Sequence, residues 1–320
     1  MHRPTRREIG LLVLGLLAML GGLVLILPPA GPEQRGLPLP LPATATTVPR
    51  APVALPRGYG VAVGYNRGTA TDLDLLGPVW YYNYQTRGVT GAHHPYVLLL
   101  RPADMPSDSG LSSLITANPG HWWMIGNEPN DPNQDNQSAA AYTRYYVHTA
   151  AIIKAADRTA GILPAGIADA DPKWAAAFQA EYLRQTGAPL DVDAWNIHCY
   201  LLDTDDPYDF FEFKRRVLRF RAWMEAEGQG EKPLVLSEFG VLYGAGCCNR
   251  PLDSSGAGLS FMRQALPWLE ASGAVTAWAW FTLDSGDQQF HGNLLSPVLP
   301  PNLSDFGALY SRRARAFNRP

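Results

Sequence analysis

Two short apolar segments of this chain each end on a glutamate. Residues 121–129 read HWWMIGNEP and residues 234–240 read LVLSEFG, so Glu128 and Glu238 each close an apolar run. A run that stops in this way is typical of a buried parallel strand that carries a carboxylate at its C-terminal end. Two carboxylates at one rim of a barrel are what hydrolysis of a glycosidic bond needs, one as acid and base and one as nucleophile. The pair therefore predicts an enzyme.

Polar and aromatic side chains also gather at the ends of the other predicted strands. Amide and imidazole groups bind sugar hydroxyls, and aromatic rings stack on the apolar faces of pyranose rings, so this mixture favours a carbohydrate-binding cleft. Trp278 and Trp280 alternate in phase and should point the same way, either toward the cleft or as filling of the barrel. The full set is Trp80, Tyr82, Asn83, Arg101, Asn127, His198, Tyr200, Trp278 and Trp280.

Eight apolar or aromatic runs recur along the chain after the first 56 residues. Helical stretches separate several of them, and one helix is expected to begin with Asp206 as N-cap and Pro207 in its first turn. Alternating strands and helices predict a parallel sheet, and the lack of a GxGxxG or P-loop motif favours a closed (β/α)8 TIM barrel over an open sheet. The predicted strands cover residues 59–65, 79–84, 96–101, 122–127, 162–167, 194–200, 234–239 and 275–282.

The N-terminal part of the chain has a different composition. Residues 9–27 form an uncharged apolar run that follows Arg3, Arg6 and Arg7. The run is long enough to cross a bilayer, and the arginines predict a cytoplasmic N-terminus. A cleaved signal peptide is the competing interpretation, but no small-x-small cleavage site follows the run. We therefore favour a membrane anchor within residues 1–27, and both interpretations export the rest of the chain.

The remaining sequence divides into a linker and one domain. Residues 28–56 contain nine prolines, a composition that favours an extended spacer over a packed core. Residues 57–320 agree in length with a single barrel of about 250 residues. The sequence thus predicts a catalytic domain outside the cytoplasm, tethered to the membrane, or secreted if the N-terminal segment is cleaved.

Charge and ligand-type residues argue against several other functions. The net charge is −3, and no basic cluster occurs beyond the N-terminus, so nucleic acid is not an expected partner. The histidines lack metal-binding spacings such as H-E-x-x-H, so no metal or cofactor is expected. Cys199, Cys247 and Cys248 leave at least one thiol unpaired, and both free thiols and one disulfide remain open.

Taken in order, these motifs resemble clan A of the retaining glycoside hydrolases, barrel enzymes with Asn-Glu at the end of the fourth strand and Glu at the end of the seventh. Within the clan, the chain is similar to glycoside hydrolase family 128 and to the glycosyl hydrolase catalytic core proteins. The resemblance spans about residues 57–283. It is carried by Trp80-Tyr81-Tyr82-Asn83, Asn127-Glu128-Pro129, Asp193, His198, Tyr200, Ser237-Glu238-Phe239-Gly240 and Ala279-Trp280-Phe281.

The resemblance implies a role for each of these residues. Glu128 resembles the acid/base, and Glu238 resembles the nucleophile. Asn127 would bind the 2-hydroxyl of the substrate, and Trp280 would form the floor of the subsite where cleavage occurs. For His198, the alternative is a core histidine that is hydrogen-bonded to the backbone. Other contacts with the substrate or the carboxylates would come from Trp80, Tyr82, Asn83, His198 and Tyr200.

The sequence therefore predicts a retaining glycosidase that acts on a β-linked polysaccharide or oligosaccharide such as a glucan. It needs no cofactor, because the bond breaks by protonation of the leaving oxygen and attack by a carboxylate. Two alternatives remain open. One is a catalytically silent carbohydrate-binding barrel, and the other is a transglycosylase that uses the same two glutamates and excludes water from the acceptor site.

Overall fold

The computed structural model describes residues 54–65, 67–242, 255–286, 292–296 and 302–317. The predicted anchor, most of the linker, Cys247 and Cys248 lie outside these ranges. The chain divides into two units, Met1–Val48 and Pro49–Pro320, and every described residue belongs to the second. Within the described ranges, no helix has the length and apolar character needed to span a membrane.

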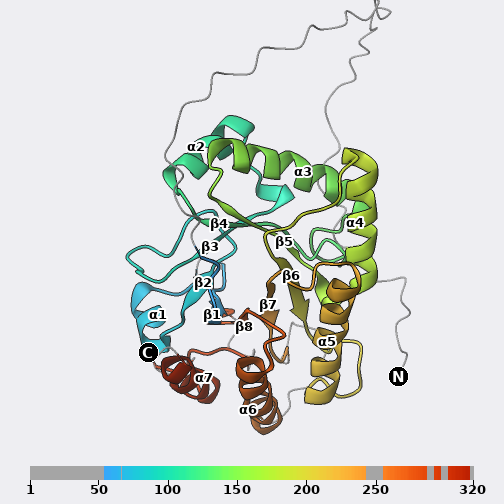
Figure 1. Cartoon of the computed structure of the whole chain (residues 1–320). Coiled ribbons are helices and arrows are strands. Elements are labelled where there is room, and N and C mark those ends of the chain that lie inside the picture. Colours follow the sequence, from blue (N-terminus) through green and yellow to red (C-terminus); the bar gives the residue numbers. More distant parts are fainter. Residues whose placement is uncertain (1–53, 66, 243–254, 287–291, 297–301, 318–320) are drawn as a thin grey trace, which may run out of the picture. The chain divides into compact units, whose positions relative to one another are not determined.

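Eight parallel strands form the centre of the second unit, as the sequence predicts (Figure 1). Two sheets have the strand orders β2-β1-β8-β7-β6 and β3-β4-β5, and single bridges from Tyr81 to Tyr96 and from Ile167 to Ile197 join them. The eight strands therefore close into a barrel. They are β1 (Gly58–Ala62), β2 (Trp80–Tyr82), β3 (Val97–Leu100), β4 (Trp122–Asn127), β5 (Gly161–Gly166), β6 (Trp195–Cys199), β7 (Leu234–Phe239) and β8 (Ala277–Phe281).

Helices surround the barrel on its outside (Figure 1). The connection from β2 to β3, residues 83–96, contains no helix, so a loop alone forms this side of the barrel. Two 3-10 turns, η2 (Pro102–Asp104) and η3 (Ala168–Ala170), follow β3 and β5. The α-helices are α1 (Ala70–Leu76), α2 (Asp108–Ala117), α3 (Ala139–Ala156), α4 (Pro172–Thr186), α5 (Phe210–Ala226), α6 (Ser255–Ser272) and α7 (Asp305–Phe317).

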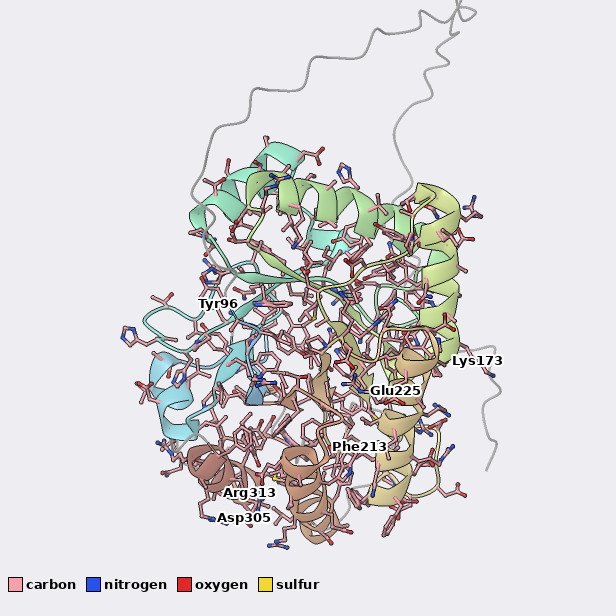
Figure 2. The ribbon with its side chains drawn as sticks, in the orientation of Figure 1. Tyr96, Lys173, Phe213, Glu225, Asp305 and Arg313 are labelled. Carbon is pink, nitrogen blue, oxygen red and sulfur yellow. The ribbon has the colours of Figure 1, made fainter. Side chains whose placement is uncertain are left out.

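Strand side chains fill two separate layers, one inside the barrel and one between the barrel and the helices. The inner layer contains large rings, and these fit because a neighbouring strand has glycine opposite them. A Cβ atom on Gly60 would lie 2.2 Å from the Trp80 ring, and one on Gly161 would lie 2.2 Å from the Trp122 ring. Phe213 of α5 belongs to the outer layer, whereas Lys173 at the start of α4 is exposed at the periphery (Figure 2).

The start of α5 differs from the prediction. Its N-cap is Asp209, whose carboxylate accepts hydrogen bonds from the amides of Phe211 and Glu212. The carboxylate of Asp206 instead accepts from the amide of Tyr208, in the turn that precedes the helix. Both aspartates stand in a favourable local pattern, so the sequence alone did not distinguish the turn from the cap.

Candidate active site

The two glutamates singled out by the sequence meet at the C-terminal mouth of the barrel. Glu128 follows β4 directly, and Glu238 lies near the end of β7. Their side chains are largely buried, with residue exposures of 8% and 5%. One carboxylate oxygen from each, together with a ring nitrogen of His198 from β6, lie within 4.8 Å of one another. Three separate strands therefore supply one compact cluster.

Tyrosine hydroxyls surround the carboxylate of Glu238. Its Oε1 atom accepts hydrogen bonds from Tyr82 (2.7 Å) and Tyr84 (2.6 Å), and its Oε2 atom accepts one from Tyr200 (2.8 Å). Burial, and next the negative charge of Glu238, raise the pKa of all three phenols well above the ordinary value. They therefore remain protonated donors at neutral pH. A hydrogen-bond donor at each oxygen is the arrangement that suits a carboxylate acceptor.

His198 holds the second carboxylate. Its Nδ1 atom lies 2.8 Å from Oε1 of Glu128 and 3.5 Å from Oε2 of Glu238, while Nε2 lies 3.0 Å from the hydroxyl of Ser237. Burial disfavours the protonated ring, but the charge of Glu238 and the hydrogen bond to Glu128 outweigh this and raise the pKa of His198. The imidazole is thus a positioning group for the carboxylate pair, and the alternative of a backbone-bonded core histidine does not fit.

The environment of Glu128 favours its protonated form. Burial is the main cause that raises the pKa of this carboxyl, and the hydrogen bond and charge of His198 oppose the increase. The negative charges of Glu238 and Asp131 add to it. The two glutamates of the site therefore have different surroundings, one with three hydroxyl donors and one with a raised pKa.

The chain bends sharply where β4 delivers Glu128. Gly126 has φ +90° and Glu128 has φ +43°, both in the left-handed region. Such a conformation costs a non-glycine residue about 1–3 kcal/mol and must be held by its surroundings. Here the amide of Glu128 donates to the carbonyl of Gly166 (3.0 Å), and the amide of Asn127 donates to the buried carboxylate of Asp135 (2.7 Å). These bonds fix the direction of the glutamate.

A buried arginine holds the segment that carries Tyr200. The guanidinium of Arg216 in α5 contacts the carbonyl of Tyr200 (3.5 Å) and the carboxylates of Asp203 (2.7 Å) and Glu212 (2.8 Å). The loop after β6 is therefore tied to the helix behind it. This places the Tyr200 hydroxyl within hydrogen-bond distance of Glu238.

Trp278 and Trp280 lie outside the barrel, away from the carboxylate cluster. Trp280 is fully buried outside the barrel, where it packs against Phe239, Phe261 and Phe306 and donates to the carbonyl of Gly292 (2.9 Å). It cannot form the floor of a subsite from there. Trp278 does share its direction, since both belong to the outer layer. The end of β8 instead directs Phe281 inward, and its ring lies perpendicular to that of Tyr200 at 6.2 Å.

The predicted contact through Trp80 also does not fit. This ring is buried in the interior of the barrel and donates to the carbonyl of Gly58, at the opposite end of β1 from the rim. Inward direction on a strand does not by itself place a residue at the mouth, because residues lower in the barrel fill its core.

The polar rim residues beside the site form structural contacts. Asn83 donates to the carbonyl of Arg87 (2.9 Å), and the side-chain amide of Asn127 donates to Gln134 (3.2 Å). Arg101 forms an ion pair with Asp135 (2.6 Å) rather than with either glutamate of the site. The predicted substrate contacts of these two asparagines therefore remain proposals.

Two members of the cluster were not assigned to it from the sequence. Tyr84 follows Tyr82 by two residues, but β2 ends at Tyr82 and Tyr84 has φ +57°, so strand alternation does not place its ring. Ser237 immediately precedes Glu238, and a β-bulge between β6 and β7 brings its hydroxyl toward His198. No sequence pattern predicts that bulge.

The cluster also contains the ligand types of a cation site. Glu128, His198 and Glu238 are close enough for one ion to contact all three. Hydroxyl protons, however, already point at both oxygens of Glu238. A cation would have to compete with these donors for Glu238, so the surroundings of this carboxylate disfavour a cation.

A sequence model described as the glycosyl hydrolase catalytic core matches residues 65–310. The chain belongs to this family. The chain is accordingly a glycosidase, and the matched region contains every residue of the cluster described above. A search of curated proteins gave no match.

Similar folds occur among solved glycoside hydrolases of family 128. The endo-β-1,3-glucanase of Sorangium cellulosum (subgroup II) has a TM-score of 0.61 at 21% identity, covering 79% of this chain and 97% of that one. The subgroup I enzyme of Amycolatopsis mediterranei, in complex with laminaritriose, has a TM-score of 0.60 at 18% identity, with coverages of 80% and 99%. For the curdlan-specific exo-β-1,3-glucanase of Blastomyces gilchristii, the values are 0.56, 22%, 79% and 97%. This likeness concerns the fold.

We predict that Gly166→Ala lowers kcat without unfolding the chain. A Cβ atom there would lie 2.0 Å from Nε2 of His198, so the imidazole must shift away from the carboxylates. A displacement of about 1 Å at a catalytic cluster costs on the order of 100-fold in rate. Kinetics on a confirmed substrate, together with thermal unfolding, measure the effect.

Gly161→Ala in the same strand is the matched control. It crowds the Trp122 ring at the other end of the barrel, so it should lower the melting temperature while kcat stays near wild type. Wild-type kcat in Gly166→Ala would show that the position of His198 does not matter for the reaction.

Proposed function

We propose that this glycosidase is a retaining hydrolase of β-linked glucan, with Glu128 as acid/base and Glu238 as nucleophile. The observation that carries the proposal is the pair of buried carboxylates, with oxygens within 4.8 Å and with different hydrogen-bond partners. Retaining enzymes hold the two carboxyl groups about 5–5.5 Å apart, whereas inverting enzymes leave about 6.5–9.5 Å for a water. The spacing supports a double displacement.

The different surroundings assign the two roles. Glu128 has a raised pKa, so it can give its proton to the leaving glycosidic oxygen while Glu238 attacks the anomeric carbon. The bond to the leaving group breaks, and a glycosyl ester of Glu238 forms. That ester removes the negative charge of Glu238, the pKa of Glu128 falls, and Glu128 then accepts a proton from the attacking water. Both carboxyls return to their starting states.

A β-1,3-glucan is the first substrate class to test. The solved relatives of similar fold are named as β-1,3-glucanases, and two of them were solved with laminaritriose or laminaripentaose. Transglycosylation would use the same two glutamates, so product analysis with an added acceptor sugar distinguishes transfer from hydrolysis. A carbohydrate-binding barrel without activity is less compatible with a site that retains both carboxylates in different surroundings.

We expect the two glutamate variants to differ in kind. Glu238→Ala should be inactive on all substrates and should regain turnover with azide, which enters the vacated side and gives an α-glycosyl azide. Glu128→Ala should keep activity on aryl β-glycosides with good leaving groups, and azide should give the β product, because azide needs no general base. Product stereochemistry by NMR is the measurement.

The exposed Glu225 of α5 supplies the control, since Glu225→Ala changes a carboxylate outside the site. Equal activity of both site variants and the wild type would show that neither glutamate is catalytic.

The pH dependence of kcat/KM should report the protonation of Glu128. The acid must carry a proton, and the pKa of Glu128 is raised. On the alkaline side, kcat/KM should therefore begin to fall at a pH above the ordinary glutamate pKa of about 4.3. Glu128→Ala on a dinitrophenyl glycoside needs no acid, so this decrease should vanish. A decrease that persists in the variant would assign it to His198 instead.

We also propose that residues 9–27 anchor the chain in a membrane with the barrel outside the cytoplasm. Support comes from the uncharged apolar run and the arginines before it. In cells that produce the full chain, protease added outside should release the barrel domain. Full protection in intact cells, with cleavage only after lysis, would place the domain inside and contradict the assignment.

A further inference from the structure

A groove opens at the N-terminal end of the barrel, and its volume is about 680 Å³. Arg57, Pro233 and Thr276 line it, and these residues directly precede β1, β7 and β8. The other walls come from the second half of α5, the end of α6 and the loops that follow both helices. Glu128 and Glu238 stand at the C-terminal ends of their strands, so the groove lies at the opposite end of the barrel from the carboxylate pair.

The end of the predicted linker forms one side of this groove. Ala54, Leu55 and the exposed Arg57 line it, and the described part of the chain begins at Ala54. Leu55 is half-buried and packs against the inner layer of the barrel, beside Val97 and Ala277, the first residues of β3 and β8. The linker thus closes the lower end of the barrel, and the residues before Ala54 continue from the edge of the groove.

Part of the groove surface is apolar and open to solvent. Leu218 of α5 lines the groove and is 40% exposed. Residues 49–53, which precede the described chain, read PRAPV, so four of these five residues are apolar. Their two prolines favour an extended conformation, so this segment loses little conformational entropy when it binds. A segment of this kind can cover Leu218 and remove its side chain from water.

The charged side chains of the groove leave room for one cation. The guanidinium of Arg221 donates to three backbone carbonyls, and the ammonium of Lys232 pairs with Asp191 (2.5 Å). The exposed Glu225 and Glu231 form no ion pair with another residue of the described ranges, and their charges act on Arg221 only at longer range. They can therefore attract a positive charge on an occupant.

We propose that residues 49–53 of the linker bind in this groove, with their apolar side chains against Leu218 and with Arg50 near Glu225 and Glu231. The bound segment fixes the place where the chain leaves the barrel, at the end opposite to the carboxylates. The linker therefore stays clear of the mouth of the barrel, which remains open to substrate. The groove and the linker act in this way whether or not the site hydrolyses a glucan.

Limited digestion of the full chain with trypsin tests this binding, because the linker contains two arginines. The Arg50–Ala51 bond lies in the proposed segment, whereas the Arg35–Gly36 bond lies far before it. Mass spectrometry gives the cleavage rate of each bond, relative to the same bond in a synthetic peptide of residues 30–56. Proteolysis follows the population of the open form, so burial of about one leucine side chain should slow cleavage after Arg50 about tenfold. Cleavage after Arg35 should not be slowed.

Variants of the groove identify where the linker binds. Leu218→Asp should bring cleavage after Arg50 to within about twofold of the peptide, because the apolar contact is lost. Glu225→Lys combined with Glu231→Lys should speed this cleavage about threefold, since exposed ion pairs are weak. The matched control is Phe211→Asp, which changes a 72% exposed apolar residue at the other end of α5 and should leave the protection unchanged. Melting temperatures show that each variant folds.

Three results would contradict the proposal. Cleavage after Arg50 as fast as in the peptide would show that the linker does not bind. Protection that persists in both Leu218→Asp and the double lysine variant would place the linker elsewhere. Protection that is lost on dilution would assign the groove to the linker of a second copy of the chain. None of these measurements requires turnover of a glycan, so their outcome is independent of the proposed activity.

Discussion

The buried imidazole of His198 is the interaction on which the site depends. It lies between two carboxylates that would otherwise repel each other at short range, and its second nitrogen is held by Ser237. Two buried negative charges at this distance are costly unless hydrogen bonds or an opposite charge compensate them. The imidazole and the tyrosine hydroxyls supply that compensation from strands on both sides of the barrel. They also give the two glutamates different hydrogen-bond partners.

Close packing of the barrel makes this arrangement possible. His198 fits only because β5 ends on Gly166, where any side chain would occupy the space of the ring. Glycines also make room for rings lower in the barrel, where Gly60 faces the indole of Trp80 and Gly161 faces that of Trp122. Interior layers in which large rings face glycines give the barrel a close-packed core and the site rigid supports.

The two glutamates of the site share their supports with the surrounding loops. Tyr84 connects Glu238 to the β2–β3 loop, and Asp135 connects the end of β4, beside Glu128, to Arg101 at the end of β3. Loops that vary readily in a barrel thus contact the groups that must not move. The position of Glu238 is thus linked to the β2–β3 loop through one tyrosine.

The eight strands, the closed parallel barrel and the pair of glutamates could be predicted from the sequence, because buried parallel strands are apolar runs and the carboxylates stand at their ends. It also placed His198 and Tyr200 at the same rim. The direction and depth of individual rings were decided by the tertiary structure. Trp280 and Trp80 look like rim aromatics in the sequence, yet one packs under the helices and the other fills the barrel. The β-bulge at Ser237, the left-handed turn at Glu128 and the space at Gly166 depend on contacts between strands distant in sequence, and no local pattern encodes such contacts.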